Sequence, residues 1–263
     1  MKFREIFRFE FVYQARRVRT WLYFAVLFAV AYGLNRTSGR DGLVISPFEV
    51  ALDTVLTGLL WVWMAPAVAG SAAARDVQTR MYPLIYAAPI SKADYLGGRF
   101  LAAFVLNALI LAAVPLGILA AVFFPFSTRG VVDPLRPAIY LSSYGLLALP
   151  TAFAFTAVQF SMAALKGRVM VSYLGNLLFV AVSIGGALCM NVLQMPALGK
   201  LLDPSLRLNI QIVMGDTWTP LQKNTVLVGL ESSILANRLV WIGVSAAILV
   251  FTHVRFRLGH RAG

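Results

Sequence analysis

The chain has 263 residues, of which 59% are hydrophobic and only 13% are charged. Because soluble domains carry about a quarter charged residues, a soluble globular protein of this composition could not cover its own surface. The net charge of +12 would suit nucleic acid, but the basic residues flank apolar segments and do not gather on one face among stacking aromatics. The composition therefore predicts an integral membrane protein with no nucleic-acid partner.

The first expected element is an interfacial amphipathic helix within residues 1–19. Apolar side chains recur there at helical spacing, and most of the charged side chains lie off this stripe. The apolar members are Phe3, Ile6, Phe7, Phe11, Ala15 and Val18. A helix with one apolar and one charged face lies in the plane of the membrane surface, so membrane lipid is its expected partner.

Six apolar segments follow as candidates for spanning helices, which need roughly 20 apolar residues; the first is short and the others are long enough. They cover residues 21–34, 50–74, 95–124, 138–165, 169–193 and 235–254. We expect the first to begin earlier than residue 21, and we expect Pro66, Pro115 and Pro150 to kink their spans. The pattern predicts an all-α integral membrane protein with six transmembrane helices in a single domain, residues 1–263.

An even number of spans places both termini on one side of the membrane. The segments expected on that side are the N-terminal region, the passage from 75 to 99, the turn at 166–168 and the tail. They hold 15 of the 23 Lys and Arg residues, but only 4 of the 11 acidic residues. Because basic loops are retained in the cytoplasm, we expect both termini to be cytoplasmic.

The passage between the second and third spans has the features of a rigid corner. Pro83 suits the first turn of a short helix over 82–88, and Pro89 prevents its continuation. Ser91 followed by Asp94 is typical of the N-terminal cap of the third span. We expect the charges of this passage to face the cytoplasm without partners in this chain. A well-capped loop that binds no other protein is the alternative.

This passage resembles the cytoplasmic coupling region of type-2 ABC exporter permeases, most closely those often fused to a zinc aminopeptidase domain. The matching residues are Pro83-Leu84, Pro89-Ile90-Ser91, Tyr95-Leu96 and Gly98-Arg99-Phe100. A second match near the last span comprises Asp203-Pro204, Trp218-Thr219-Pro220, Asn224-Thr225, Asn237-Arg238 and Trp241. The chain as given includes no peptidase domain and no second membrane half, so both a separate subunit and a part of a longer protein fit.

The resemblance implies the permease subunit of an ABC exporter in a bacterial inner membrane. Its partners would be a second permease half, expected to be another copy, and two cytoplasmic ATPase subunits that bind ATP and Mg. The sequence lacks a Gly-rich phosphate loop, so we expect no enzymatic activity, cofactor or metal site in this chain. In this family the coupling region, here residues 75–94, docks onto the ATPase. The residues expected to carry the coupling are Arg75, Asp76, Arg80, Tyr82, Pro83, Tyr86, Lys92 and Arg99.

A few polar residues lie within or near the spans. Glu49 and Asp53 share one helical face. Ser46 and Glu49 are spaced as in a capping box, with Pro47 at the first helical position, so Glu49 has a structural role at the helix N-terminus. Asp53 is left as a candidate for the translocation path. Amides within spans either hydrogen-bond between helices or line such a path. The path candidates are Asp53, Asn107, Gln159 and Asn176.

Residues 194–234, between the fifth and sixth spans, are too many for a simple turn. Apolar runs alternate there with helix breakers at Pro196, Pro204, Gly215 and Pro220. The resembled family has short external helices that re-enter the membrane in this place. Such a helical re-entrant region and a loosely ordered loop both fit the composition.

Two other functions remain open. A stand-alone ion-coupled carrier would need intramembrane carboxylates or histidines to bind its ions, and only Asp53 comes near this requirement. A membrane anchor or scaffold for a peptidase-containing assembly is also compatible with the spans.

Overall fold

The computed structural model describes residues 2–37, 46–81, 83, 89–124, 136–228 and 231–256. Throughout these residues the regular structure is helical. Six helical segments are long and apolar enough to cross a membrane, and they are Val18–Asn35, Pro47–Gln78, Lys92–Phe123, Pro137–Lys166, Val169–Asn191 and Ser232–Arg255. The chain is therefore a multi-pass helical membrane protein, and the predicted all-α fold with six spans is confirmed.

The helices follow the predicted order. Helix α1 (Lys2–Ala15) precedes the first span, α2 (Val18–Thr37), and the second span is α3 (Pro47–Gln78). The third span comprises α5 (Lys92–Leu111) and α6 (Ala113–Phe123), and the fourth comprises α7 (Pro137–Ser142), the π-helix η1 (Ser143–Ala148) and α8 (Leu149–Lys166). The fifth span comprises η2 (Val169–Val171) and α9 (Ser172–Asn191), and the sixth is α13 (Ser232–Arg255). Between the last two lie α10 (Pro196–Leu202), η3 (Asn209–Met214), α11 (Gly215–Thr217) and α12 (Pro220–Thr225).

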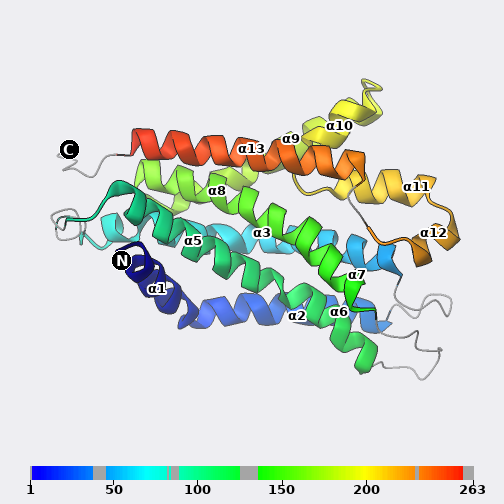
Figure 1. Ribbon diagram of the computed structural model, residues 1–263, viewed down its shortest axis with the longest axis horizontal. Helices are drawn as coiled ribbons and strands as arrows, with labels where there is room; N and C mark the ends of the chain where they lie inside the picture. The colour runs from blue at the N-terminus through cyan, green and yellow to red at the C-terminus, as the bar shows by residue number, and fades with distance from the viewer. Residues whose placement is uncertain are drawn as a thin grey trace.

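The spans run side by side along the long axis of the molecule (Figure 1). Helix α1, the last turns of α3 and α13 and the first turn of α5 meet at one end, which we call the α1 end. Helices α11 and α12 lie at the opposite end, which we call the α12 end. As an even number of spans requires, the first helix and the last turn of the last helix lie at the same end.

Two of the spans begin with the predicted caps. The Ser46 hydroxyl accepts a hydrogen bond from the Glu49 main-chain N–H (3.1 Å), which caps α3. The Ser91 hydroxyl accepts one from the Asp94 main-chain N–H (3.0 Å), which caps α5. Each cap satisfies an N–H group that the first turn of a helix would otherwise leave unpaired.

Helix α3 is the central helix, and α9 contacts its main chain where Pro66 interrupts the hydrogen bonding. A proline has no N–H to donate to the carbonyl four residues earlier, which is that of Val62. Asn176 of α9 supplies this donor (Nδ2–O 2.7 Å), and Ser172 of α9 donates to the Pro66 carbonyl (3.0 Å). Polar side chains of α9 thus satisfy the main chain of α3 inside the bundle, as membrane helices with prolines require.

The other two intramembrane prolines accompany breaks in their spans. Helix α5 ends at Leu111, and the chain turns at Ala112 before α6, which contains Pro115. The π-helix η1 lies directly before the first turn of α8, which contains Pro150. Both irregular turns lie where the proline ring displaces the preceding carbonyls. The third and fourth spans are therefore segmented helices.

Short helices, and not a loosely ordered loop, make up the described part of 194–234. Helix α10 packs against the end of α9, where Gly186 and Gly199 bring the two main chains together. A Cβ on Gly199 would lie only 2.7 Å from the Gly186 carbonyl oxygen. The Asp203 carboxylate then accepts hydrogen bonds from the main-chain N–H groups of Ser205 (3.1 Å) and Leu208 (2.6 Å). Insertion of these short helices into the membrane stays a prediction.

Candidate functional site

Helix α3 is longer than predicted, and this changes the surroundings of the charges after residue 74. It continues to Gln78, so Arg75 and Asp76 belong to its last turns and not to a loop. Asp76 is only 3% exposed and the Arg75 side chain only 12%. The expectation that the charges of this passage have no partner in this chain is wrong for Arg75, Asp76 and Arg99, because all three turn inward and form ion pairs.

Four charged side chains from α1, α3 and α5 form a buried network, here called the charge cluster: Glu10, Arg75, Asp76 and Arg99. Arg75 donates to both carboxylate oxygens of Glu10 (Nη1–Oε1 3.1 Å, Nη2–Oε2 2.8 Å). Arg99 is hydrogen-bonded to Asp76 and its Nη2 lies 3.9 Å from Glu10 Oε2. Two positive and two negative charges balance, which offsets the cost of removing them from water.

Neutral and aromatic groups complete the charge cluster. The Tyr95 hydroxyl donates to Asp76 Oδ2 (3.0 Å), and the Gln14 amide donates to Glu10 Oε1 (2.8 Å). The Tyr95 ring also lies 4.7 Å from the Arg99 guanidinium, as a cation–π contact. The carboxylates thus have additional donors, and the end of α3 is joined to both α1 and α5.

The buried face of α1 differs from the predicted apolar stripe. Glu10 and Gln14 are almost fully buried (0% and 1% exposed), whereas Phe3, a member of the predicted stripe, is 38% exposed. Phe11 packs against the core, as expected. The sequence-based prediction missed Glu10. Its position three residues after Phe7, on the same helical face, is the signal that could have revealed it.

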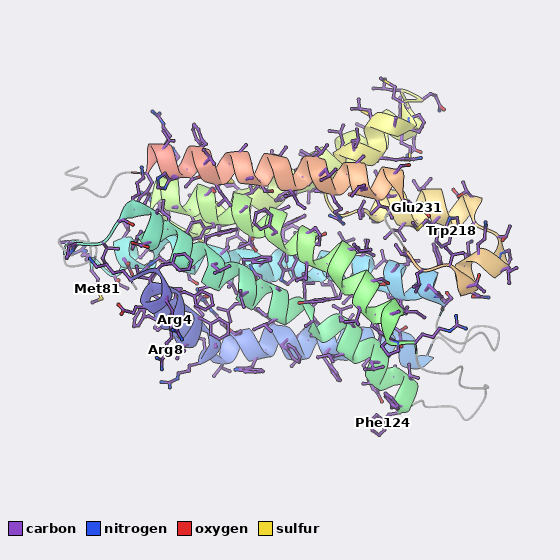
Figure 2. The ribbon with its side chains drawn as sticks, viewed as in Figure 1. Arg4, Arg8, Met81, Phe124, Trp218 and Glu231 are labelled. Carbon is purple, nitrogen blue, oxygen red and sulfur yellow. The ribbon has the colours of Figure 1, made fainter. Side chains whose placement is uncertain are left out.

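Helix α1 packs closely against the start of α5. A Cβ on Gly98 would lie 3.0 Å from the Phe3 carbonyl oxygen and 3.0 Å from a methyl group of Ile6. The Lys2 amino group also donates to the Pro89 carbonyl, just before α5 begins. Figure 2 shows Arg4 and Arg8 of α1 and Met81, which follows α3, at the same end of the bundle. Because Glu10 also binds Arg75 of α3, α1 contacts both helices that flank the 79–91 passage.

The other predicted coupling residues have different positions. Arg80 is exposed, with a left-handed φ of 57°, and Pro83 is also exposed. Lys92 donates to the main-chain carbonyl of Val254 in the last turn of α13 (3.2 Å). Tyr82 and Tyr86, together with most of the predicted cross-piece over 82–88, lie outside the described residues. Contact of any of these residues with a partner protein stays a prediction.

Three of the four path candidates join helices to one another. Asn107, Gln159 and Asn176 are fully buried. Asn107 donates to the Thr156 hydroxyl (3.0 Å), and Gln159 donates to the Asn176 side-chain oxygen (2.6 Å). These bonds favour the interhelical interpretation of the amides. Asp53 is partly buried near the α12 end of α3, and its role in a path stays a prediction.

Residues of the second sequence match come together towards the α12 end. Asn237 donates to the Asp203 carbonyl (2.8 Å), Trp241 donates to a carbonyl of α10 (3.0 Å), and Arg238 donates to the Pro204 carbonyl (3.3 Å). The side chains of α13 thus bind the main chain that follows the fifth span. In the structure, these residues of the second sequence match therefore hold α10 against α13 by hydrogen bonds.

In the comparisons with known proteins, no family model matches this chain, and no curated protein matches it.

Proposed function

We propose that this chain is the membrane-spanning subunit of an ATP-binding-cassette exporter, driven by ATP hydrolysis in a separate cytoplasmic subunit. The observation that carries the proposal is the charge cluster. It joins α3 and α5, the two helices that flank the 79–91 passage, to each other and to α1. This is the passage whose residues resemble a coupling region.

A coupling element has to transmit a movement, and a flexible loop would absorb it. Here the helices on both sides of the passage are joined by buried ion pairs that cannot separate without leaving charges unpaired. A displacement of the passage therefore moves α1, α3 and α5 together. Two conformational states of the ATPase would contact this unit differently and so favour different positions of the spans.

The proposed assembly contains two copies of this permease and two ATPase subunits in a bacterial inner membrane. The α1 end would face the cytoplasm, which agrees with the excess of Lys and Arg in its segments. The predicted contacts with the ATPase are made by Arg80, Tyr82, Pro83 and Tyr86, whereas Arg75, Asp76 and Arg99 would support them from inside the bundle.

Co-purification from native membranes tests this proposal. We expect the affinity-tagged chain to retain an ATP-binding-cassette subunit in equal amount, and we expect Tyr82→Glu with Tyr86→Glu to lose it. Leu221→Glu, at the opposite end of the bundle, is the matched control and should retain the subunit. Absence of any ATPase with the unmodified chain would favour a carrier or an anchor. Retention of the ATPase with unchanged turnover by the double variant would show that the passage is not the docking site.

A further inference from the structure

A cavity of about 440 Å³ lies between α3, α8 and α9, beside the turn that follows α10. This volume falls within the roughly 300–1,000 Å³ of small-molecule sites. Phe155 and Phe179 line it as a stacked pair with ring centroids 3.8 Å apart. Trp63 is a further lining residue and is 56% exposed. Phe155 and Phe179 are each only 2% exposed, so the aromatic surface that the cavity presents is mainly that of Trp63, and Ile184 and Leu188 extend the apolar lining.

The polar side chains of the lining are few, and one is charged. Ser183 and Asn191 come from α9, and Ser205 and Arg207 come from the turn after α10. Among the described lining residues, Arg207 alone carries a charge. An apolar cavity with one charged group and a few hydroxyl and amide groups selects a ligand that is apolar along most of its length and charged at one point.

The charge of Arg207 is not balanced within the described part of the chain. Its Nη1 donates to the Gln211 side-chain oxygen at 3.3 Å, and none of the ion pairs among the described residues includes it. A guanidinium has five donors in a planar fork that matches a phosphate or a carboxylate. The group that Arg207 is suited to bind is therefore an anion.

The cavity lies beside a surface that suits lipid. Leu177, Ile184 and Leu188 of α9 are each more than half exposed, and α9 belongs to a membrane span. A ligand can therefore enter laterally from the acyl chains of the bilayer. We propose that the cavity binds an anionic amphiphile from the bilayer, with an acyl chain against Trp63, Ile184 and Leu188 and a phosphate or carboxylate headgroup on Arg207. The site requires no ATPase partner, so it is tested on this chain alone.

Three probe molecules separate the contributions of the ligand's alkyl chain and of its negative charge. The purified full chain, in a neutral maltoside detergent, is titrated with dodecyl phosphate, dodecylphosphocholine and inorganic phosphate, and bound molecules are counted by native mass spectrometry. We expect one saturable site for dodecyl phosphate, about tenfold weaker binding of dodecylphosphocholine, and no binding of inorganic phosphate. Equal binding of the first two, or binding of phosphate alone, would overturn the proposal.

Variants then locate the site. Arg207→Gln should weaken dodecyl phosphate binding about tenfold, Arg207→Lys should retain most of it, and Ala187→Phe should fill the cavity and abolish it. Arg136→Gln removes an exposed charge before α7 that lies outside the lining, and it should leave binding unchanged. Unchanged melting temperatures show that the variants are folded. Wild-type binding by Arg207→Gln or by Ala187→Phe, or an equal loss in Arg136→Gln, would each overturn the site.

Discussion

Glu10 shows how one buried charge can determine the position of a whole helix. It is fully buried and accepts hydrogen bonds from Arg75 and Gln14. If α1 left the bundle, Arg75 would lose its closest carboxylate while still partly enclosed. An uncompensated buried charge is far more costly than a paired one. The charge cluster therefore fixes α1 against α3 and α5 more specifically than the exposed aromatic residues of α1 could.

Removing one member of the cluster should cost more than replacing a pair. We expect Glu10→Gln to lower the free energy of unfolding by roughly 3–5 kcal/mol, because Arg75 and Arg99 then share one carboxylate. The double variant Glu10→Met with Arg75→Met should regain part of this loss, since no charge of that pair is left buried. Circular dichroism monitors the unfolding of the purified chain in detergent and measures the change in the free energy of unfolding for both variants.

The control for this prediction lies on the same helix. Glu5→Gln removes an exposed carboxylate and should change the free energy of unfolding by less than about 0.5 kcal/mol. An equal loss of stability in Glu5→Gln would mean that the net charge of the protein, and not the buried Glu10–Arg75 pair, determines the effect. Strict additivity of the two Met substitutions would show that Glu10 and Arg75 do not interact.

At the scale of helices, α3 shows how a proline inside a span makes one helix depend on another. The Val62 carbonyl has no donor within α3 because Pro66 lacks an N–H, and Asn176 of α9 supplies one at 2.7 Å. Asn176 also accepts from Gln159 of α8 at 2.6 Å. A single amide thus connects three spans, which explains its complete burial within an apolar bundle.

This dependence predicts a non-additive pair of substitutions. Asn176→Leu leaves the Val62 carbonyl unpaired and should lower the free energy of unfolding by about 1–3 kcal/mol. In a Pro66→Ala background, residue 66 regains an N–H for that carbonyl, so the same substitution should cost about 1 kcal/mol less. The difference is measured as a double-mutant cycle. Asn191→Leu, at an exposed amide of α9, is the control, and equal costs in both backgrounds would contradict the explanation.

The positions of the spans could be predicted from the sequence because length and apolar composition are local properties. The caps at Ser46 and Ser91 could be predicted for the same reason, since each involves residues three apart. The end of α3 could not. Arg75 and Asp76 end the apolar run of the span, which predicts an end of the buried helix there, but their ion pairs with Glu10 of α1 and Arg99 of α5 offset the cost of burying both charges.

The candidate site was predicted less completely than the spans. The resemblance identified Arg99 and the residues around it, but not their inward direction, because that depends on Glu10 from a distant part of the chain. The aromatic and charged lining of the cavity likewise combines α3, α8, α9 and a turn near residue 207. No spacing within one segment indicates which of these side chains meet.

At the scale of the whole molecule, the two ends of the bundle differ in structure. The α1 end has the charge cluster and the junction of α1, α3, α5 and α13, whereas Trp218 and Glu231 mark the opposite end, near α12 (Figure 2). Of the two proposals, only that of an ATP-driven exporter depends on which end faces the cytoplasm. An ATPase can act only on the cytoplasmic end, whereas the amphiphile site is a property of the bundle in either orientation.

Cysteine labelling determines the orientation. Cys189 is the single cysteine of the chain, so a Cys189→Ser background allows Gln78→Cys at the α1 end and Leu221→Cys at the α12 end, both at exposed positions. A membrane-impermeant maleimide should label Leu221→Cys in intact cells and Gln78→Cys in inverted vesicles, because the excess of Lys and Arg favours a cytoplasmic α1 end. Detergent should expose both, as the control for reactivity. The reverse pattern would place the 79–91 passage outside the cell, where no ATPase could drive it, while the binding of dodecyl phosphate at Arg207 would be unaffected.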